Sequence, residues 1–215
     1  MKNLHLVMFD IDGTLVDSSQ FEDDCFEKAT RTVLGGGINT NWASYEHVSD
    51  EGIVRELLQG LGDDTERRAI RHRIRAEFVS RIRGYVQKNE VNEIIGASRL
   101  LNHLRQREDV VLALATGGWK STAELKLSSA GLDFEGMAFA SSDDHFDRVE
   151  IMKVAEGRTG IPSFSSRTYV GDGAWDKAAA EALKFNFVLV GSKISNPKQV
   201  GNLADIPRFE ALAGL

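Results

Sequence analysis

The sequence predicts an α/β fold, namely a doubly wound parallel sheet (a Rossmann-like core) with an inserted all-helical cap domain. Short apolar runs alternate with amphipathic stretches over most of the chain, which is typical of a parallel sheet covered by helices on both faces. Between about residues 18 and 90, however, the pattern is helical only. The 215 residues therefore divide into a core of 1–16 and 93–215 and a cap of 17–92.

Five short apolar runs are predicted to form the strands of the sheet. Each is bounded by polar residues or glycines, as buried strands usually are. They lie at residues 4–9, 110–115, 137–140, 168–170 and 187–190.

Four helices are predicted to accompany these strands. Residues 97–107 place apolar side chains on one helical face. Ser121 and Glu124 have the spacing of a capping box, which predicts that a second helix starts there. Two more helices are expected over about 149–157 and after Ala174.

The predicted cap contains three helices. Ser19 and Glu22 have capping-box spacing at the start of the first, which ends at the glycines of 35–37. A short second helix is expected near 53–58, and apolar residues repeat every four positions over 70–82 in the third. Because the insertion directly follows the first strand, we expect the cap to lie over that strand's carboxyl end.

Composition excludes several classes of protein. Lys and Arg total 26 against 32 Asp and Glu, a formal net charge of −6, which argues against a nucleic-acid or anionic-membrane binder. Cys25 is the only cysteine, so an intramolecular disulfide and a multi-cysteine zinc site are excluded. No apolar run approaches the roughly 20 residues of a membrane span. The apolar stretch within 1–13 is too short for a signal peptide, so we expect a cytoplasmic protein.

Two carboxylates follow the first predicted strand. Asp10 and Asp12 are two residues apart, so in an extended chain their side chains point the same way. Ligands of open α/β sheets bind at this end of the strands. If the chain turns at Gly13, both carboxylates can face one substrate, although an Asp-Gly turn without any chemistry is the alternative.

Two further strand ends carry polar residues and glycines. Thr116 follows the second strand and can donate to an anion, while Gly117 and Gly118 allow backbone N–H groups to approach it closely. Asp172 follows the fourth strand and can bind a hard cation, with Asp176 four residues later.

All three motifs lie at the carboxyl ends of predicted parallel strands, which meet at one edge of the sheet. Two acidic strand ends, one hydroxyl-bearing strand end and several glycines suit magnesium-dependent phosphoryl transfer, because Mg²⁺ prefers carboxylates together with substrate phosphate.

The run from Asp10 to Thr14 resembles the D-x-D-G-T signature of the haloacid dehalogenase-like hydrolase superfamily. The strand that ends at Thr116 resembles its second motif, and 171–173 with Asp176 resembles its fourth. The position and size of the cap are similar to those of the phosphoglycolate phosphatase and β-phosphoglucomutase branch. The resemblance covers the whole chain.

The resemblance implies a role for each of these side chains. Asp10 is expected to be the nucleophile that forms an aspartyl-phosphate, and Asp12 the general acid and base. Mg²⁺ is the implied cofactor, held by Asp10, the backbone carbonyl of Asp12, and Asp172. Asp176 is expected to support the outer shell of the metal. The phosphoryl group is expected to be bound by Gly13, Thr116, Gly117 and Gly118.

The third motif departs from the family pattern, which has a lysine at a helix start. Arg148 lies nearest the predicted helix start, and its guanidinium can hold both Asp10 and the phosphoryl charge. Lys153 has the usual residue type but lies more than a turn into the helix. We favour Arg148 as the catalytic cation and keep Lys153 as the alternative.

The predicted function is a magnesium-dependent phosphatase that hydrolyses a small phosphorylated metabolite through a covalent aspartyl-phosphate. A sugar phosphomutase on the same scaffold is the alternative, which Thr14 disfavours because such mutases often carry an aliphatic residue there. Two other classes are disfavoured. A signalling receiver domain is shorter and has no cap, and a catalytically silent binding module would not need Asp10, Asp12 and Asp172. We expect no nucleic-acid or membrane partner, and a monomer or weak homodimer.

Two tryptophans allow more than one interpretation. Trp119, after the glycines of the second motif, either lines the substrate entrance or packs against the cap. Trp42 lies in a predicted cap loop, where packing or surface exposure is expected.

Overall fold

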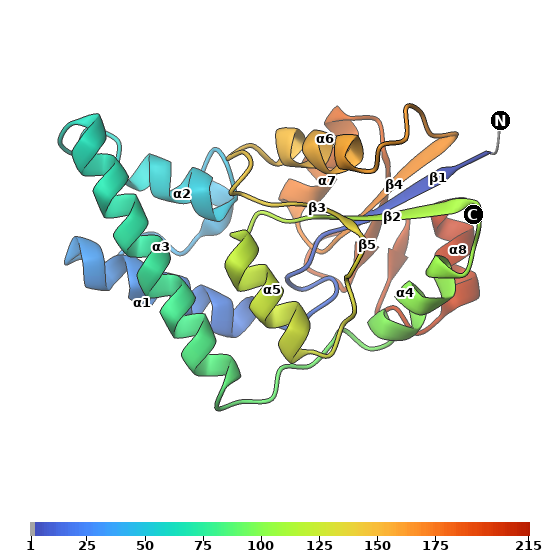
Figure 1. Ribbon diagram of the computed structural model, residues 1–215, viewed down its shortest axis with the longest axis horizontal. Helices are drawn as coiled ribbons and strands as arrows, with labels where there is room; N and C mark the ends of the chain where they lie inside the picture. The colour runs from blue at the N-terminus through green and yellow to red at the C-terminus, as the bar shows by residue number, and fades with distance from the viewer. Residues whose placement is uncertain (1–2) are drawn as a thin grey trace.

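The computed structural model describes residues 3–215 as a parallel sheet with helices on both faces and a helical unit at one end (Figure 1). The six strands lie in the order β3-β2-β1-β4-β5-β6, and every pair is parallel. The strands are β1 His5–Phe9, β2 Val110–Ala115, β3 Ala138–Ala140, β4 Ser166–Gly171, β5 Asn186–Val190 and β6 Gln199–Val200. The predicted fold class is therefore confirmed, with one short edge strand more than the sequence predicted.

The strand order changes direction at β1, since the chain continues to β2 and β3 on one side and to β4, β5 and β6 on the other. The carboxyl ends of β1, β2 and β4 therefore lie next to one another at the point where open α/β sheets bind their ligands.

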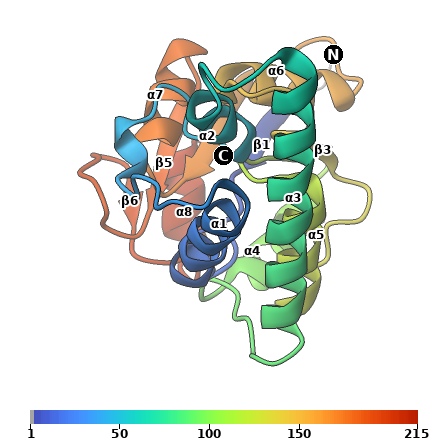
Figure 2. The same ribbon diagram turned by 90° about the vertical axis from the view of Figure 1, so that its left-hand side faces the viewer.

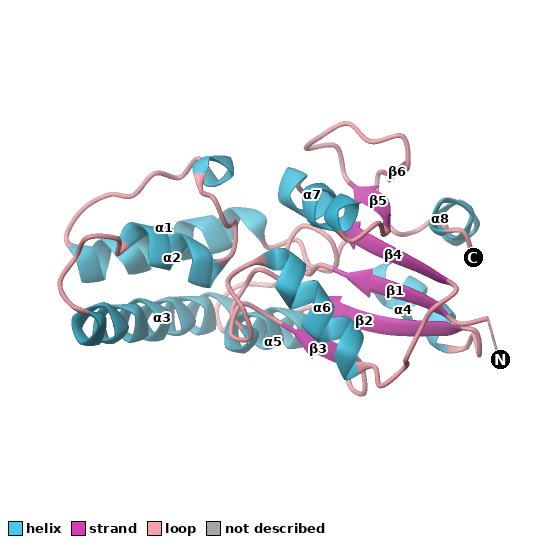
Figure 3. Cartoon of the chain, turned by 90° about the horizontal axis from the view of Figure 1, so that it is seen from above, coloured by secondary structure: helices cyan, strands magenta, loops and turns pink. Residues whose placement is uncertain are grey.

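Helices cover both faces of the sheet (Figure 3). They are α4 Ala97–Arg105, α5 Lys120–Ser129, α6 Arg148–Arg158, α7 Ala174–Ala182 and α8 Ile206–Ala213. Val7 and Phe9 of β1 face the cluster formed with α4, α5 and α8, whereas Leu6 and Met8 face the cluster formed with α6 and α7. This alternation follows from the two-residue period of a strand that is buried on both sides.

The elements between β1 and α4 form the cap: α1 Ser19–Leu34, the 3-10 turn η1 Trp42–Ser44, α2 Asp50–Leu57 and α3 Asp64–Val86. They enclose their own hydrophobic cluster, in which Phe26, Ile74 and Phe78 are buried. The four-residue repeat predicted for the third helix thus lies on its buried face, but α3 begins earlier than that repeat. Asp63 caps it, and Glu66 completes a capping box.

Both capping boxes predicted at Ser19 and Ser121 are wrong. Helix α1 has Ser18 at its N-cap, and α5 has Trp119; neither residue makes a side-chain capping bond. The side chain of Glu22 makes an ion pair with a lysine of the core instead.

The two segments that connect cap and core run side by side. Asp17 N–H donates to the carbonyl oxygen of Asn92 at 3.0 Å, and Val16 forms a bridge with Glu93. Figure 2 shows α1 and α3, which continue from these segments, next to each other. The division into 1–16 and 93–215 as core and 17–92 as cap remains a prediction, and these paired segments are where its boundary falls. Within residues 3–215, no helix is long and apolar enough to cross a membrane.

Candidate active site

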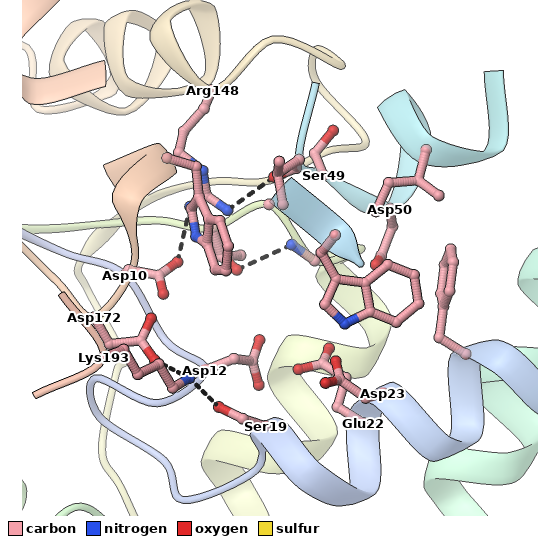
Figure 4. A pocket seen from close by; sticks show the side chains of 18 residues that line it. Asp10, Asp12, Ser19, Glu22, Asp23, Ser49, Asp50, Arg148, Asp172 and Lys193 are labelled. Atoms are coloured by element: carbon pink, nitrogen blue, oxygen red, sulfur yellow. Dashed lines mark hydrogen bonds and ion pairs between the residues drawn. The ribbon is translucent and has the colours of Figure 1, made fainter. Parts of the chain in front are cut away.

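The three strand-end motifs meet beside a cavity of about 330 Å³ between core and cap (Figure 4). Asp10, Thr116 and Asp172 follow β1, β2 and β4, and all three line this cavity. Each is nearly inaccessible to solvent. The edge-of-sheet placement expected from the sequence is thus what the fold produces.

Three buried carboxylates form one cluster. One oxygen each from Asp10, Asp172 and Asp176 lies within 4.8 Å of the others. Asp176 accepts hydrogen bonds from the backbone N–H groups of Asp172 (3.1 Å) and Gly173 (3.0 Å), which fix it at the start of α7.

The cluster holds excess negative charge. Burial, followed by repulsion from Asp176, raises the pKa of Asp10 well above its usual value. The same two causes raise the pKa of Asp172 to about 6. A hard divalent cation relieves such repulsion, and Mg²⁺ prefers carboxylate oxygens such as these as ligands. The residues present therefore fit Mg²⁺, and Asp10 and Asp172 are the side chains that would hold it.

Arg148 supplies the positive charge beside this cluster. Its guanidinium lies 3.1 Å from Asp10 and 3.0 Å from Asp176, and it also donates to the Val48 carbonyl of the cap at 3.1 Å. Lys153 lies five residues further along α6, which turns it about 140° around the helix axis. It pairs with Glu150 at 2.7 Å and is half exposed. Of the two alternatives for the third motif, the structure brings only Arg148 to the carboxylates.

Asp12 faces a different partner from the other acids. Its carboxylate lies 2.5 Å from Nζ of Lys126 and accepts a hydrogen bond from the Ser18 hydroxyl. Lys126 is fully buried and makes a second ion pair with Glu22. Burial acts to raise the pKa of Asp12. The attraction of Lys126 and hydrogen bonds to the carboxylate outweigh this effect, so the pKa is lowered overall. The side chain of Asp12 is thus placed apart from the cluster that fits a metal.

Two glycines of the predicted phosphate-binding set are required by close approach. A Cβ at Gly117 would lie 2.3 Å from a guanidinium nitrogen of Arg148. Gly13 has φ +74°, and a Cβ there would lie 2.0 Å from a carboxylate oxygen of Asp172. Larger side chains at these positions would displace the charged groups. The hydroxyl of Thr116 accepts from Gly118 N–H at 3.0 Å, which orients it at the cavity wall.

The cap contacts the core directly at the second motif. Asp50 N–H donates to the Gly117 carbonyl at 2.8 Å, and the Asp50 carboxylate accepts from Trp119 N–H at 2.8 Å. The Ser49 hydroxyl donates to the Phe146 carbonyl at 2.6 Å. These bonds hold the start of α2 against the loop that follows β2 and against the segment that precedes α6.

Comparison with known families agrees with this geometry. A model of the haloacid dehalogenase-like hydrolase family matches residues 4–184. The chain belongs to the haloacid dehalogenase-like hydrolases. It is therefore a member of an enzyme family, and the match includes all the strand-end motifs described above.

Solved structures with the same fold have low sequence identity to this hydrolase. A hydrolase from Pseudomonas syringae is 21% identical, with 97% of this chain and 90% of that chain covered, at a TM-score of 0.68. A β-phosphoglucomutase from Clostridium difficile is 15% identical (100% and 98% covered, TM-score 0.76). CbbY from Rhodobacter sphaeroides, solved with phosphate, is 14% identical (96% and 96% covered, TM-score 0.70). The search of curated proteins gives no significant match.

Several residues in or behind the cavity of this hydrolase were not predicted. Lys193, in the loop after β5, reaches Asp172 at 2.5 Å. Lys126 had a readable signal, because it lies on the same helical stripe as the buried Ala123 and Leu127. Trp42 lines the cavity, so the expectation that it only packs or lies on the surface was incomplete. Of the two interpretations of Trp119, packing against the cap is the one observed.

We predict that Asp50→Asn changes the pH dependence of stability. Burial raises the pKa of Asp50 to about 7. A carboxyl whose pKa is higher in the folded than in the unfolded state loses stability as pH rises between the two values. The free energy of unfolding of the variant, relative to wild type, should therefore increase between about pH 4 and pH 7 and then remain level. We expect an increase of about 2 kcal/mol, because the Asp50 side chain keeps some contact with solvent.

Urea unfolding at several pH values measures this difference. Asp24→Asn is a matched control, because Asp24 is exposed on α1 and pairs with Lys28 on the surface. A difference between the Asp50 variant and wild type that does not change with pH would show that Asp50 does not titrate in this range.

Proposed function

We propose that this hydrolase is a magnesium-dependent phosphatase that acts on a small phosphorylated metabolite through a covalent aspartyl-phosphate. The observation that carries the proposal is the pairing of Asp10 with Arg148 at 3.1 Å in a cavity that Asp12 and Asp172 also line. Asp10, beside the Arg148 guanidinium, provides the nucleophile. Asp12, which pairs with Lys126 instead, provides a separate acid–base group in the same site.

In the first step, a carboxylate oxygen of Asp10 attacks phosphorus, and the bond from phosphorus to the leaving alkoxide breaks. Asp12 acts here in its protonated form, gives its proton to the alkoxide and becomes a carboxylate. In the second step Asp12 takes a proton from water, which attacks phosphorus and releases phosphate and the free Asp10 carboxylate.

The remaining groups position and stabilise the phosphoryl oxygens. Arg148 offers a fixed positive charge, and the Thr116 hydroxyl and the backbone N–H of Gly117 offer hydrogen bonds. Bound Mg²⁺ supplies charge neutralisation for the phosphoryl group and the carboxylates. The structural relatives support a phosphorylated substrate. CbbY was solved with phosphate and, as an Asp-to-Asn mutant, with xylulose-(1,5)bisphosphate.

The test is release of phosphate from p-nitrophenyl phosphate by the purified protein, with and without Mg²⁺. Removal of the metal by EDTA is expected to lower the rate at least about a hundredfold, because the ion contributes several kcal/mol to the transition state. Excess Mg²⁺ should restore it. Full activity in EDTA would contradict the metal dependence, and isomerisation of a sugar phosphate without phosphate release would favour the phosphomutase.

A further inference from the structure

The two walls of the cavity differ in charge. Both cations among the described residues that line it, Arg148 and Lys193, belong to the core, and both are paired with strand-end carboxylates. The cap contributes no lysine or arginine to that part of the lining but three acids, Glu22, Asp23 and Asp50. In Figure 4 these three lie on the side of the cavity opposite Asp10 and Arg148.

This distribution disfavours substrates with a second anionic group. A phosphoryl group facing Asp10 leaves the rest of the substrate directed at the cap. A second phosphate or a carboxylate there would lie against acidic side chains of the cap, and like charges at contact distance repel. The described cap lining offers such a group no lysine or arginine. The bisphosphate that a phosphomutase forms, and phosphoglycolate, are therefore poorly matched to this cavity.

The charge balance favours a cationic substrate. Six acidic side chains line the cavity against two cations, and Lys126 pairs with Asp12 and Glu22 from behind. Burial raises the pKa of Glu22 well above its usual value and that of Asp50 to about 7, so Asp23 is the cap acid that most readily carries a negative charge. A divalent metal and a phosphoryl dianion cancel one another, so their binding leaves this excess unchanged. On the cap side, this negative charge is centred on Asp23.

Aromatic rings lie beside these cap acids. Phe26 and Trp42 pack edge to face with ring centroids 5.8 Å apart, and both line the cavity. Although burial raises the pKa of Asp23, the Trp42 side chain acts to lower it, which places this ring and this carboxyl group close together. Trp175 lines the cavity from α7. Aromatic faces with an adjacent carboxylate are the usual surroundings of bound organic ammonium groups.

We propose that the substrate is the phosphate monoester of a small alcohol that carries an amine or a quaternary ammonium group. The ammonium lies at the cap wall beside Asp23 and Trp42, and the phosphoryl group faces Asp10. The cavity volume of about 330 Å³ is suited to an ester of this size. The inference rests on the proposed phosphatase function and adds its substrate class.

The test compares two esters of equal shape, phosphocholine and its uncharged isostere 3,3-dimethylbutyl phosphate. Wild type should have a kcat/KM about tenfold or more higher for phosphocholine, from the ammonium contacts alone. Asp23→Asn should reduce this ratio severalfold, since it removes one of the charges that the ammonium contacts. Asp24→Asn, whose side chain lies outside the cavity and pairs with Lys28, should keep the wild-type ratio.

The outcomes separate the two proposals. Equal or faster turnover of the isostere, or a preference for phosphoglycolate, would overturn the cationic substrate class and leave the phosphatase intact. No phosphate release from any of these esters or from p-nitrophenyl phosphate would contradict the phosphatase itself. An unchanged ratio in Asp23→Asn would overturn the assignment of the ammonium to this wall.

Discussion

Replacement of Asp10 by asparagine is expected to lower phosphate release by at least about a thousandfold, because the amide cannot attack phosphorus. The substitution keeps the size of the side chain, so the cavity should retain its shape. Rates of phosphate release under Mg²⁺ saturation measure the effect. Borohydride reduction of the wild-type protein during turnover, followed by mass spectrometry, should find the reduced product at position 10 and nowhere else.

The loss should not come from unfolding. Burial and the neighbouring carboxylates raise the pKa of Asp10, so its charge is unfavourable in the folded protein and Asp10→Asn should leave the free energy of unfolding equal or higher. Asp17→Asn is the matched control, since Asp17 is exposed in the same segment and should retain activity. Phosphate release by the Asp10 variant near the wild-type rate would remove Asp10 as nucleophile.

Much of the fold could be predicted because its signals are local. Each central strand is a short apolar run, and Asp10, Thr116 and Asp172 directly follow three of them. Their convergence follows from parallel pairing alone, since parallel strands carry their carboxyl ends to one edge. The cap was predicted for the same reason, because a long helical stretch interrupts the alternation.

The C-terminal elements were not predicted, although one had a signal. Strand β6 has two residues, too few for an apolar pattern. Helix α8, however, begins after Asp205, whose side chain accepts from Arg208 N–H, and it has Pro207 in its first turn. Aspartate followed by proline is a recognised helix-start pattern, so this helix could have been predicted.

The ion-pair partners of the site carboxylates could not be predicted in the same way. Lys193 and Lys126 reach Asp172 and Asp12 from elements far away in the sequence. Such contacts depend on side-chain direction and on how closely the cap lies against the core, and neither has a local sequence pattern. Glu22 is an example. Its local sequence predicts a helix-capping role, but in the structure its carboxylate pairs with Lys126.

Replacement of Lys126 by methionine is expected to have the largest effect on stability. Its ammonium is fully buried between Asp12 and Glu22, and the lower pKa of Asp12 depends on it. Removing one partner of a buried ion pair leaves uncompensated charge, which destabilises by about 3–5 kcal/mol. Urea unfolding at neutral pH measures the loss. The loss should shrink as pH falls, because protonation of the two carboxylates then removes the charge that Lys126 no longer balances.

Two further variants separate charge from packing. Lys120→Met on the same helix removes a half-exposed lysine 3.8 Å from Glu124, and should change the free energy of unfolding by less than about 0.5 kcal/mol. Adding Glu22→Gln to Lys126→Met should recover part of the lost stability, because burial and Asp12 raise the pKa of Glu22 and its charge, once Lys126 is gone, is unfavourable. If the double variant is no more stable than Lys126→Met, the loss comes from packing of the lysine side chain, and Lys126 does not hold Asp12 and Glu22 in place by its charge.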